Sequence, residues 1–118
     1  MKLTITNRHI IDGMLSPDVS LAGAKEVMFN DCYYLKVSPE ILVGVEKLTF
    51  VSCPHLEIIT NFPVGSKKIR FNDCKHLRII PHIPDGVEEL TFVFCEFLET
   101  ITNFPAGVKK IEFEDCGN

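Results

Sequence analysis

The stretch VEKLTFVSCPHLEIITNFP, residues 45–63, returns almost unchanged as VEELTFVFCEFLETITNFP at residues 87–105. Residues 66–84 carry the same frame with a looser spelling. A step of 21 residues separates the members of three series: Cys32, Cys53, Cys74, Cys95 and Cys116; Phe29, Phe50, Phe71, Phe92 and Phe113; and Gly23, Gly44, Gly65, Gly86 and Gly107. A fixed period of this size is typical of solenoids, propellers and repeat arrays. The repeat therefore decides the fold.

Each repeat contains one short strand followed by a different kind of segment. Apolar and polar residues alternate in KLTFV, residues 47–51, which predicts a strand. Beyond it the apolar residues come at every third position, a spacing that favours an irregular or 3-10 segment. These residues are Cys53, Leu56, Ile59 and Phe62. Pro63 then blocks further helix and Gly65 permits a tight return to the next strand.

Stacking of the repeats predicts columns of equivalent apolar residues in the core, because one repeat cannot bury its apolar edge alone. We expect these columns to be Val27, Leu48, Ile69, Leu90 and Ile111; the five phenylalanines; the five cysteines; Leu35, Leu56, Leu77 and Leu98; and Ile59, Ile80 and Ile101.

The full frame is V-x-x-L-x-F-x-x-C-x-x-L-x-x-I-x-x-F-P-x-G, and from residue 23 to residue 116 it resembles the leucine-rich repeat, L-x-x-L-x-L-x-x-N/C-x-L. The cysteine is similar to that of plant and ribonuclease-inhibitor repeats. The short length and the closing proline are similar to bacterial-effector or FNIP-like repeats. The resemblance implies an α/β-type repeat solenoid: a right-handed coil with a parallel sheet on its concave side, an irregular or 3-10 convex side and little α-helix.

The chain is interpreted as a single domain, residues 1–118, with atypical ends. In residues 1–22, Leu3 and Ile5 copy the strand spacing, but Val27 follows Leu3 by 24 residues, which indicates a degenerate capping rung. Residues 23–118 form four full repeats and a final partial repeat without a cap. An uncapped rung leaves a sheet edge open. We expect a self-association edge at Lys110, Ile111, Glu112 and Phe113, used by a homodimer; the alternative is a fragment of a longer chain.

Composition excludes several functions. The formal net charge is −4 and both signs are scattered, which argues against nucleic acid as the main partner. No apolar run approaches the length that spans a bilayer, and the N-terminus lacks the apolar core of a signal peptide. Five cysteines in equivalent positions indicate buried structural thiols in a reducing compartment, the cytoplasm, or the host cytosol for an effector.

Strand residues that point away from the core would form the concave face, which repeat proteins commonly use for binding. The predicted partner-binding residues are Lys47, Thr49, Val51, Lys68, Arg70, Asn72, Glu89, Thr91, Val93, Phe94 and Glu112. They combine a basic centre, an acidic flank and an apolar patch at Val93 and Phe94, a mixture typical of protein-binding sites. The alternative is an ordinary solvated sheet face.

No residues are predicted to be catalytic, and no cofactor or metal is expected. The cysteine series places one thiol on each rung in a line, not four around a point. Tyr34, His55, His76 and Phe97 share one slot and predict an aromatic ladder; a two-histidine metal site is the weaker alternative.

These observations predict a non-catalytic protein–protein interaction module, not an enzyme, acting as an adaptor or a secreted bacterial effector. Two alternatives stay open. One is the recognition fragment of a larger enzyme whose catalytic domain lies elsewhere. The other is a self-associating structural repeat.

Overall fold

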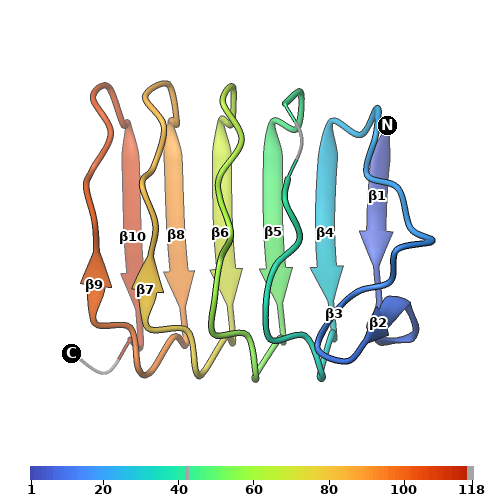
Figure 1. Cartoon of the computed structure of the whole chain (residues 1–118). Helices are drawn as coiled ribbons and strands as arrows, with labels where there is room; N and C mark the ends of the chain where they lie inside the picture. Colours follow the sequence, from blue (N-terminus) through green and yellow to red (C-terminus); the bar gives the residue numbers. More distant parts are fainter. Residues whose placement is uncertain (42, 117–118) are drawn as a thin grey trace.

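The chain winds into a parallel β-solenoid, seen in a computed structural model that describes residues 1–41 and 43–116 (Figure 1). Each turn of the coil contributes one strand to a six-stranded parallel sheet, and the turns wind in a right-handed sense. In spatial order the strands are β1 (Lys2–Ile5), β4 (Glu26–Asn30), β5 (Lys47–Val51), β6 (Lys68–Asn72), β8 (Glu89–Val93) and β10 (Lys110–Glu114).

The sheet register follows the 21-residue period. Leu48 lies opposite Val27 and Ile69, and Phe50 lies opposite Phe29 and Phe71, so the predicted columns align as expected. Burial is confirmed for their inner members, whereas Ile111 and Phe113 are exposed and Ile101 and Cys116 are only partly buried, because the last rung has no described neighbour beyond it. The phenylalanine rings stack along the axis with centroid separations between 4.7 and 5.5 Å and interplanar angles of 10° or less. This spacing is about that of neighbouring strands, because each ring is carried by its own rung.

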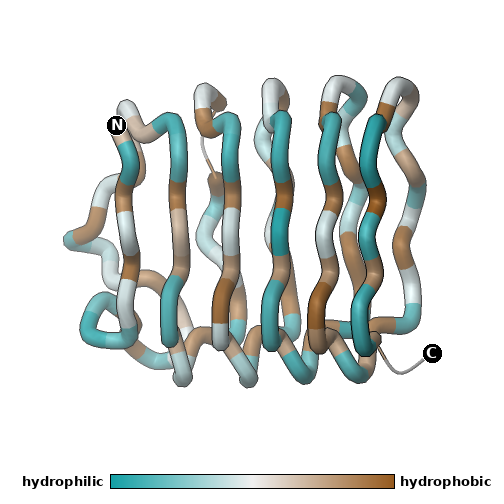
Figure 2. The backbone as a smooth tube through the Cα atoms, turned by 180° about the vertical axis from the view of Figure 1, so that it is seen from behind, coloured by the Kyte–Doolittle hydropathy of each residue, from teal (hydrophilic) through white to brown (hydrophobic). Residues whose placement is uncertain are grey.

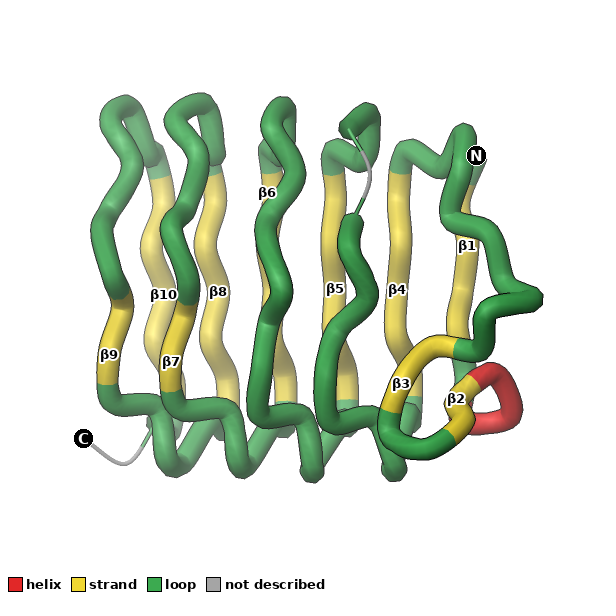
Figure 3. The backbone as a smooth tube through the Cα atoms, in the orientation of Figure 1, coloured by secondary structure: helices red, strands yellow, loops and turns green. Residues whose placement is uncertain are grey.

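The return side of each turn is extended and irregular. Its regular structure is limited to two paired strands, β7 (Ile79–Ile80) and β9 (Thr100–Ile101), and a single bridge between Val37 and Ile58 (Figure 3). Within the described residues, the one 3-10 helix is η1 (Asn7–His9), in the N-terminal segment and not in the repeats. In the repeats, the apolar residues at every third position after the strand therefore lie on nearly extended backbone and not on a 3-10 helix.

The N-terminal segment closes the first end of the coil. β1 joins the sheet with Leu3 opposite Val27, and Ile5 behind it is buried. The extra residues between β1 and β4 form η1 and an antiparallel pair, β2 (Ile10–Ile11) and β3 (Met14–Leu15). Ile10, Leu15 and Val19 pack against the core, so this segment supplies apolar cover that a preceding rung would otherwise give.

Asparagine side chains tie rungs together on the return side. The Asn61 amide oxygen accepts a hydrogen bond from the Ile41 backbone N–H at 3.1 Å, and its nitrogen donates to the Ile41 carbonyl at 3.2 Å. Asn103 makes the same pair of bonds to Ile83, at 2.8 and 3.0 Å. Each amide therefore satisfies two backbone groups of the preceding rung, in alternate rungs of the coil.

No helix within the described part of the chain has the length and apolarity needed to cross a membrane.

Candidate protein-binding face of the sheet

The solvent-facing side of the six-stranded sheet, here called the sheet face, carries most of the predicted binding residues. Viewed from this side, hydrophilic and hydrophobic residues alternate along β6 and β10, whereas hydrophobic residues follow one another in β4 and at the ends of β5 and β8 (Figure 2). The register aligns the outward residues in three columns: Glu26, Lys47, Lys68, Glu89 and Lys110; Met28, Thr49, Arg70, Thr91 and Glu112; and Asn30, Val51, Asn72, Val93 and Glu114. Adjacent members of a column are about 4.8 Å apart.

Charges on neighbouring rungs of the coil largely pair with each other. On the sheet face, Nζ of Lys68 lies 3.0 Å from Glu89 and Nζ of Lys47 lies 3.5 Å from Glu26. Lys68 holds the pKa of Glu89 below its ordinary value by hydrogen bonding to the carboxylate, and Lys110 and Lys47 add to the effect. Such exposed pairs contribute little stability individually, so their main effect is to neutralise the surface.

Two further columns alternate in sign from rung to rung. One runs Lys25, Glu46, Lys67, Glu88, Lys109, and its end pairs lie at 3.9 and 3.8 Å. The other, on the return side, runs Lys36, Glu57, Arg78, Glu99. Here Arg78 donates to Glu99, which raises the pKa of Arg78 and lowers that of Glu99. Opposite charges therefore meet at successive rungs along the coil.

Arg70 breaks this pattern. Its neighbours in register are Thr49 and Thr91, both neutral, and it makes no ion pair with any residue that the structure describes. Its side chain is exposed and borders a shallow hollow of about 310 Å³. The hollow is lined by Lys47, Thr49, Lys68, Ile69, Arg70, Glu89, Thr91, Lys110 and Glu112. An uncompensated guanidinium thus stands in the middle of the sheet face, beside two hydroxyl groups.

Phe94 lies in the turn after β8, next to the sheet face, in an unusual conformation. Its φ is 54°, in the left-handed region, which is strained for a bulky side chain. The equivalent positions, also with positive φ, hold Asp31, Ser52, Asp73 and Asp115. Phe94 is 47% exposed, so about half of this large apolar residue lies in water despite the strain. Strained exposed residues of this kind cluster at functional sites.

Val93 does not contribute to the surface, contrary to the sequence-based expectation of an apolar patch at Val93 and Phe94. The Val93 side chain is buried, although it ends β8 on the outward-facing column. It lies in register between Asn72 and Glu114, whose longer side chains flank a short branched one. The apolar part of the patch is therefore Phe94 alone.

The thiols form a structural column. Cys32, Cys53, Cys74 and Cys95 are fully buried, as expected, whereas Cys116 is partly exposed. Burial raises the pKa of the Cys95 thiol to about 12. The neighbouring Cys53 thiol, and then burial, raise the pKa of Cys32 far above its ordinary value. A reactive cysteine needs a lowered pKa, so neither thiol has the character of a nucleophile.

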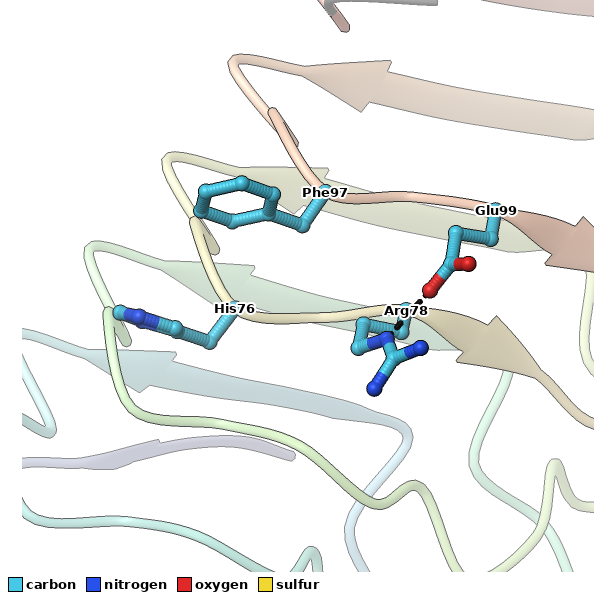
Figure 4. Close-up of a pocket in the computed structure, with 4 residues that line it drawn as sticks. All are labelled: His76, Arg78, Phe97 and Glu99. Atoms are coloured by element: carbon cyan, nitrogen blue, oxygen red, sulfur yellow. Dashed lines mark hydrogen bonds and ion pairs between the residues drawn. The ribbon is translucent and has the colours of Figure 1, made fainter.

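A second hollow, of about 530 Å³, lies on the return side, where the sequence predicted only an aromatic ladder (Figure 4). His76 and Phe97 form one wall, with ring centroids 5.7 Å apart, and the Arg78–Glu99 pair forms the other. His55 continues the stack below His76, which confirms the ladder over three rungs. Tyr33, and not Tyr34, covers the His55 ring edge-on at 4.8 Å.

The histidine pair gains no further ligand in the structure. The Nδ1 atom of His76 lies 2.7 Å from the Pro54 carbonyl, within hydrogen-bonding distance. Among the described residues, no group of three or more His, Cys, Asp or Glu side chains is placed to hold a metal ion. The column Lys36, Glu57, Arg78, Glu99 runs beside the aromatic ladder with the same 21-residue period. Together the two columns could have predicted the hollow on the return side.

No family model matches the chain, and no significant match was found among curated proteins or among solved structures. The class of protein is therefore defined by its fold, a parallel β-solenoid with 21-residue turns.

Proposed function

We propose that this chain is a non-catalytic protein-binding module of the leucine-rich-repeat type, which engages its partner through the sheet face. The 21-residue frame, the buried cysteine column and the parallel sheet support this class. Solenoids of this kind offer an extended regular surface whose residues vary without disturbing the core. An adaptor role in a reducing compartment, the cytoplasm, fits the buried thiols.

Arg70 is the observation that carries the proposal. The Lys25–Lys109 and Lys36–Glu99 columns alternate in sign, and on the sheet face Lys47 and Lys68 pair with Glu26 and Glu89, so most of these charges are compensated within the chain. Arg70 stands between two threonines and has Lys47 and Lys68 on the adjoining column. A guanidinium binds a carboxylate through two parallel hydrogen bonds, and threonine hydroxyls can donate further bonds to the same group. The partner is therefore expected to place an Asp or Glu side chain against Arg70.

Phe94 supplies the second contact of the proposed site. An exposed aromatic side chain at the rim of a polar surface is the kind of residue that contributes most to protein interfaces. Its strained backbone is a cost to folding that Asp or Ser would reduce, as in the other repeats. We infer that Phe94 is retained despite this cost because its side chain contributes to binding the partner.

Selection from a random-peptide display library tests the proposal, because it needs no knowledge of the natural partner. We expect the wild-type chain to select peptides enriched in Asp and Glu. The Arg70→Glu variant should bind these peptides more weakly than the wild type by about 2–5 kcal/mol, since a repulsive charge pair replaces a charge-assisted hydrogen bond. Phe94→Asp should weaken the same peptides.

Arg78→Glu is the matched control, because it makes the same change on the return side, where Arg78 pairs with Glu99. It should retain the selected peptides. Peptides that bind Arg70→Glu as well as the wild type would contradict the proposal, and so would a selection without acidic enrichment.

A further inference from the structure

The rung that contains β10 leaves apolar side chains uncovered that are buried in the middle of the coil. Phe113 is 47% exposed and Ile111 40%, whereas Phe71 and Ile69, in the same slots, are 0% and 1% exposed. On the return side Phe104 is 54% exposed, against 6% for Phe62. These three residues, Phe104, Ile111 and Phe113, are called the β10 end face. β10 is also the outer strand of the sheet, with one edge unpaired by any described residue.

At the opposite end of the coil the apolar core is covered, although β1 is also an outer strand of the sheet. Ile5, the equivalent of the phenylalanines, is 1% exposed, and Ile10, Leu15 and Val19 pack over the core there. A head-to-tail contact would have to place the β10 end face against this covered end. Two β10 end faces can instead meet each other, which gives a closed two-fold contact and not an open filament.

The sequence of β10, KIEFE, is self-complementary in an antiparallel pairing centred on Glu112. Lys110 then lies opposite Glu114 of the second copy, and Ile111 lies opposite Phe113 of the second copy. Residues directly opposite in antiparallel strands have Cβ atoms about 4.5–5.5 Å apart, close enough for a charge pair and for apolar contact. Outward residues meet outward residues and inward residues meet inward ones, so the core of one copy continues into the other.

Glu112 is the single unfavourable element of this pairing, because it meets its own copy at the axis. Lys110 of the same chain lies 3.7 Å from Glu112 and offsets part of the repulsion. The axis is perpendicular to the sheet, so it also brings the two return sides together. Phe104 of each copy then faces the other copy instead of solvent.

We propose that a second copy of this chain covers the β10 end face, through antiparallel pairing of β10 with β10 about a two-fold axis at Glu112. The contact joins two six-stranded sheets into one and continues the phenylalanine column across the joint. Lys110 and Glu112 line one border of the hollow beside Arg70, whereas Arg70 itself lies on β6, away from the joint, and stays exposed on the sheet face of both copies. The test below measures only the mass of the chain, so its outcome does not depend on whether the proposed partner binds.

The test is the mass in solution of the reduced chain, measured by sedimentation equilibrium over a range of concentrations. We expect a reversible dimer and no larger species. Lys110→Glu and Glu114→Lys should each weaken the dimer by about tenfold or more, because each converts two symmetry-related attractions into repulsions. The double variant Lys110→Glu/Glu114→Lys should restore it, since the swapped charges again oppose each other. Glu112→Gln should tighten it.

Lys109→Glu is the matched control, with the same change of charge on the neighbouring residue, which pairs with Glu88 in its own chain. It should dimerise like the wild type. Thermal unfolding of each single variant verifies that the chain still folds, since both substitutions lie on exposed positions. A monomer at every concentration would overturn the proposal. A dimer whose dissociation constant is unchanged by the Lys110 and Glu114 substitutions would also overturn it. So would open-ended association into larger species.

Discussion

Phe71 and Phe113 occupy the same slot of the repeat, yet one is sealed in the middle of the coil and the other lies half open at its edge. Phe71 is stacked between Phe50 and Phe92, whereas Phe113 stacks on Phe92 alone. The surrounding sequence is nearly the same, so the repeat itself does not determine burial. In a solenoid, burial comes from the neighbours, and equal residues contribute unequally according to their place.

Removing the two rings separately is the strongest way to test this difference. Phe71→Ala should lower the free energy of unfolding by ~3–5 kcal/mol, because it opens a cavity inside a packed column. At concentrations low enough to keep the chain monomeric, Phe113→Ala should cost about 1–2 kcal/mol, since about half of this residue is then in water. Urea unfolding of both variants measures the costs. Equal costs would contradict the idea that position determines burial energy.

The asparagine bridges extend the comparison to polar groups. Asn61→Ala should cost ~1–3 kcal/mol, because it leaves the Ile41 N–H and carbonyl without their partners in a partly buried place. Asn103→Ala removes the same bonds to Ile83 nearer the open end, where water can replace them, and should cost less.

Asn61→Asp is the informative control for this prediction. It keeps the oxygen that accepts from Ile41 N–H but loses the nitrogen that donates to the carbonyl. Its second oxygen then faces the Ile41 carbonyl oxygen, so we expect a cost at least as large as that of the alanine variant, measured by urea unfolding at neutral pH. A cost well below that of the alanine variant would show that the bond from the Ile41 N–H alone matters.

Alkaline pH tests whether the buried Cys95 thiol is held in its protonated form. The folded-state pKa of Cys95 is raised to about 12, whereas an unfolded cysteine titrates near ~8.5. Its contribution is therefore fully present below about pH 8.5 and is lost as pH rises towards 12. Between pH 7.5 and 9.5 the loss should be ~1 kcal/mol for this thiol.

Cys95→Ala should accordingly reduce the fall in stability between pH 7.5 and 9.5 by ~1 kcal/mol, as measured by urea unfolding under reducing conditions. An identical pH dependence of Cys95→Ala and wild type would refute the assignment of a buried, protonated thiol.

The smallest expected effect concerns the strained turn. Phe94→Asp should raise the free energy of unfolding by ~0.5–1 kcal/mol, because Asp tolerates the left-handed conformation better than Phe. Ser52→Phe places the same strain on an inner rung and should cost a similar amount. Thermal melts compare the two. A loss of stability in Phe94→Asp would mean that the ring makes a stabilising contact within the chain.

The repeat period was sufficient to predict the core. Cysteines, phenylalanines and strand residues spaced by 21 residues must stack once the chain coils, and Leu48 does lie between Val27 and Ile69. The first strand could also be predicted, because Leu3 and Ile5 keep the alternation of the repeats although the spacing to Val27 is longer. In the structure this strand does pair with β4.

The surface was harder to predict, because it depends on side-chain lengths and local backbone and not on the period. Val93 has the right place in the frame to be exposed, but its side chain is buried. Tyr34 shares the slot of His55, yet the neighbouring Tyr33 makes the ring contact. The isolation of Arg70 becomes evident only when the pairs around it are measured.

The alternating charge columns also determine how such a coil can lengthen. Deleting a single rung would bring Glu46 next to Glu88, or Glu57 next to Glu99, and oppose like charges along two columns at once. Deleting or adding two rungs preserves both alternations and the spacing of Asn61 and Asn103. The smallest genetic module that can be gained, lost or exchanged without penalty is therefore a pair of turns, and an engineered longer version should be assembled from such pairs.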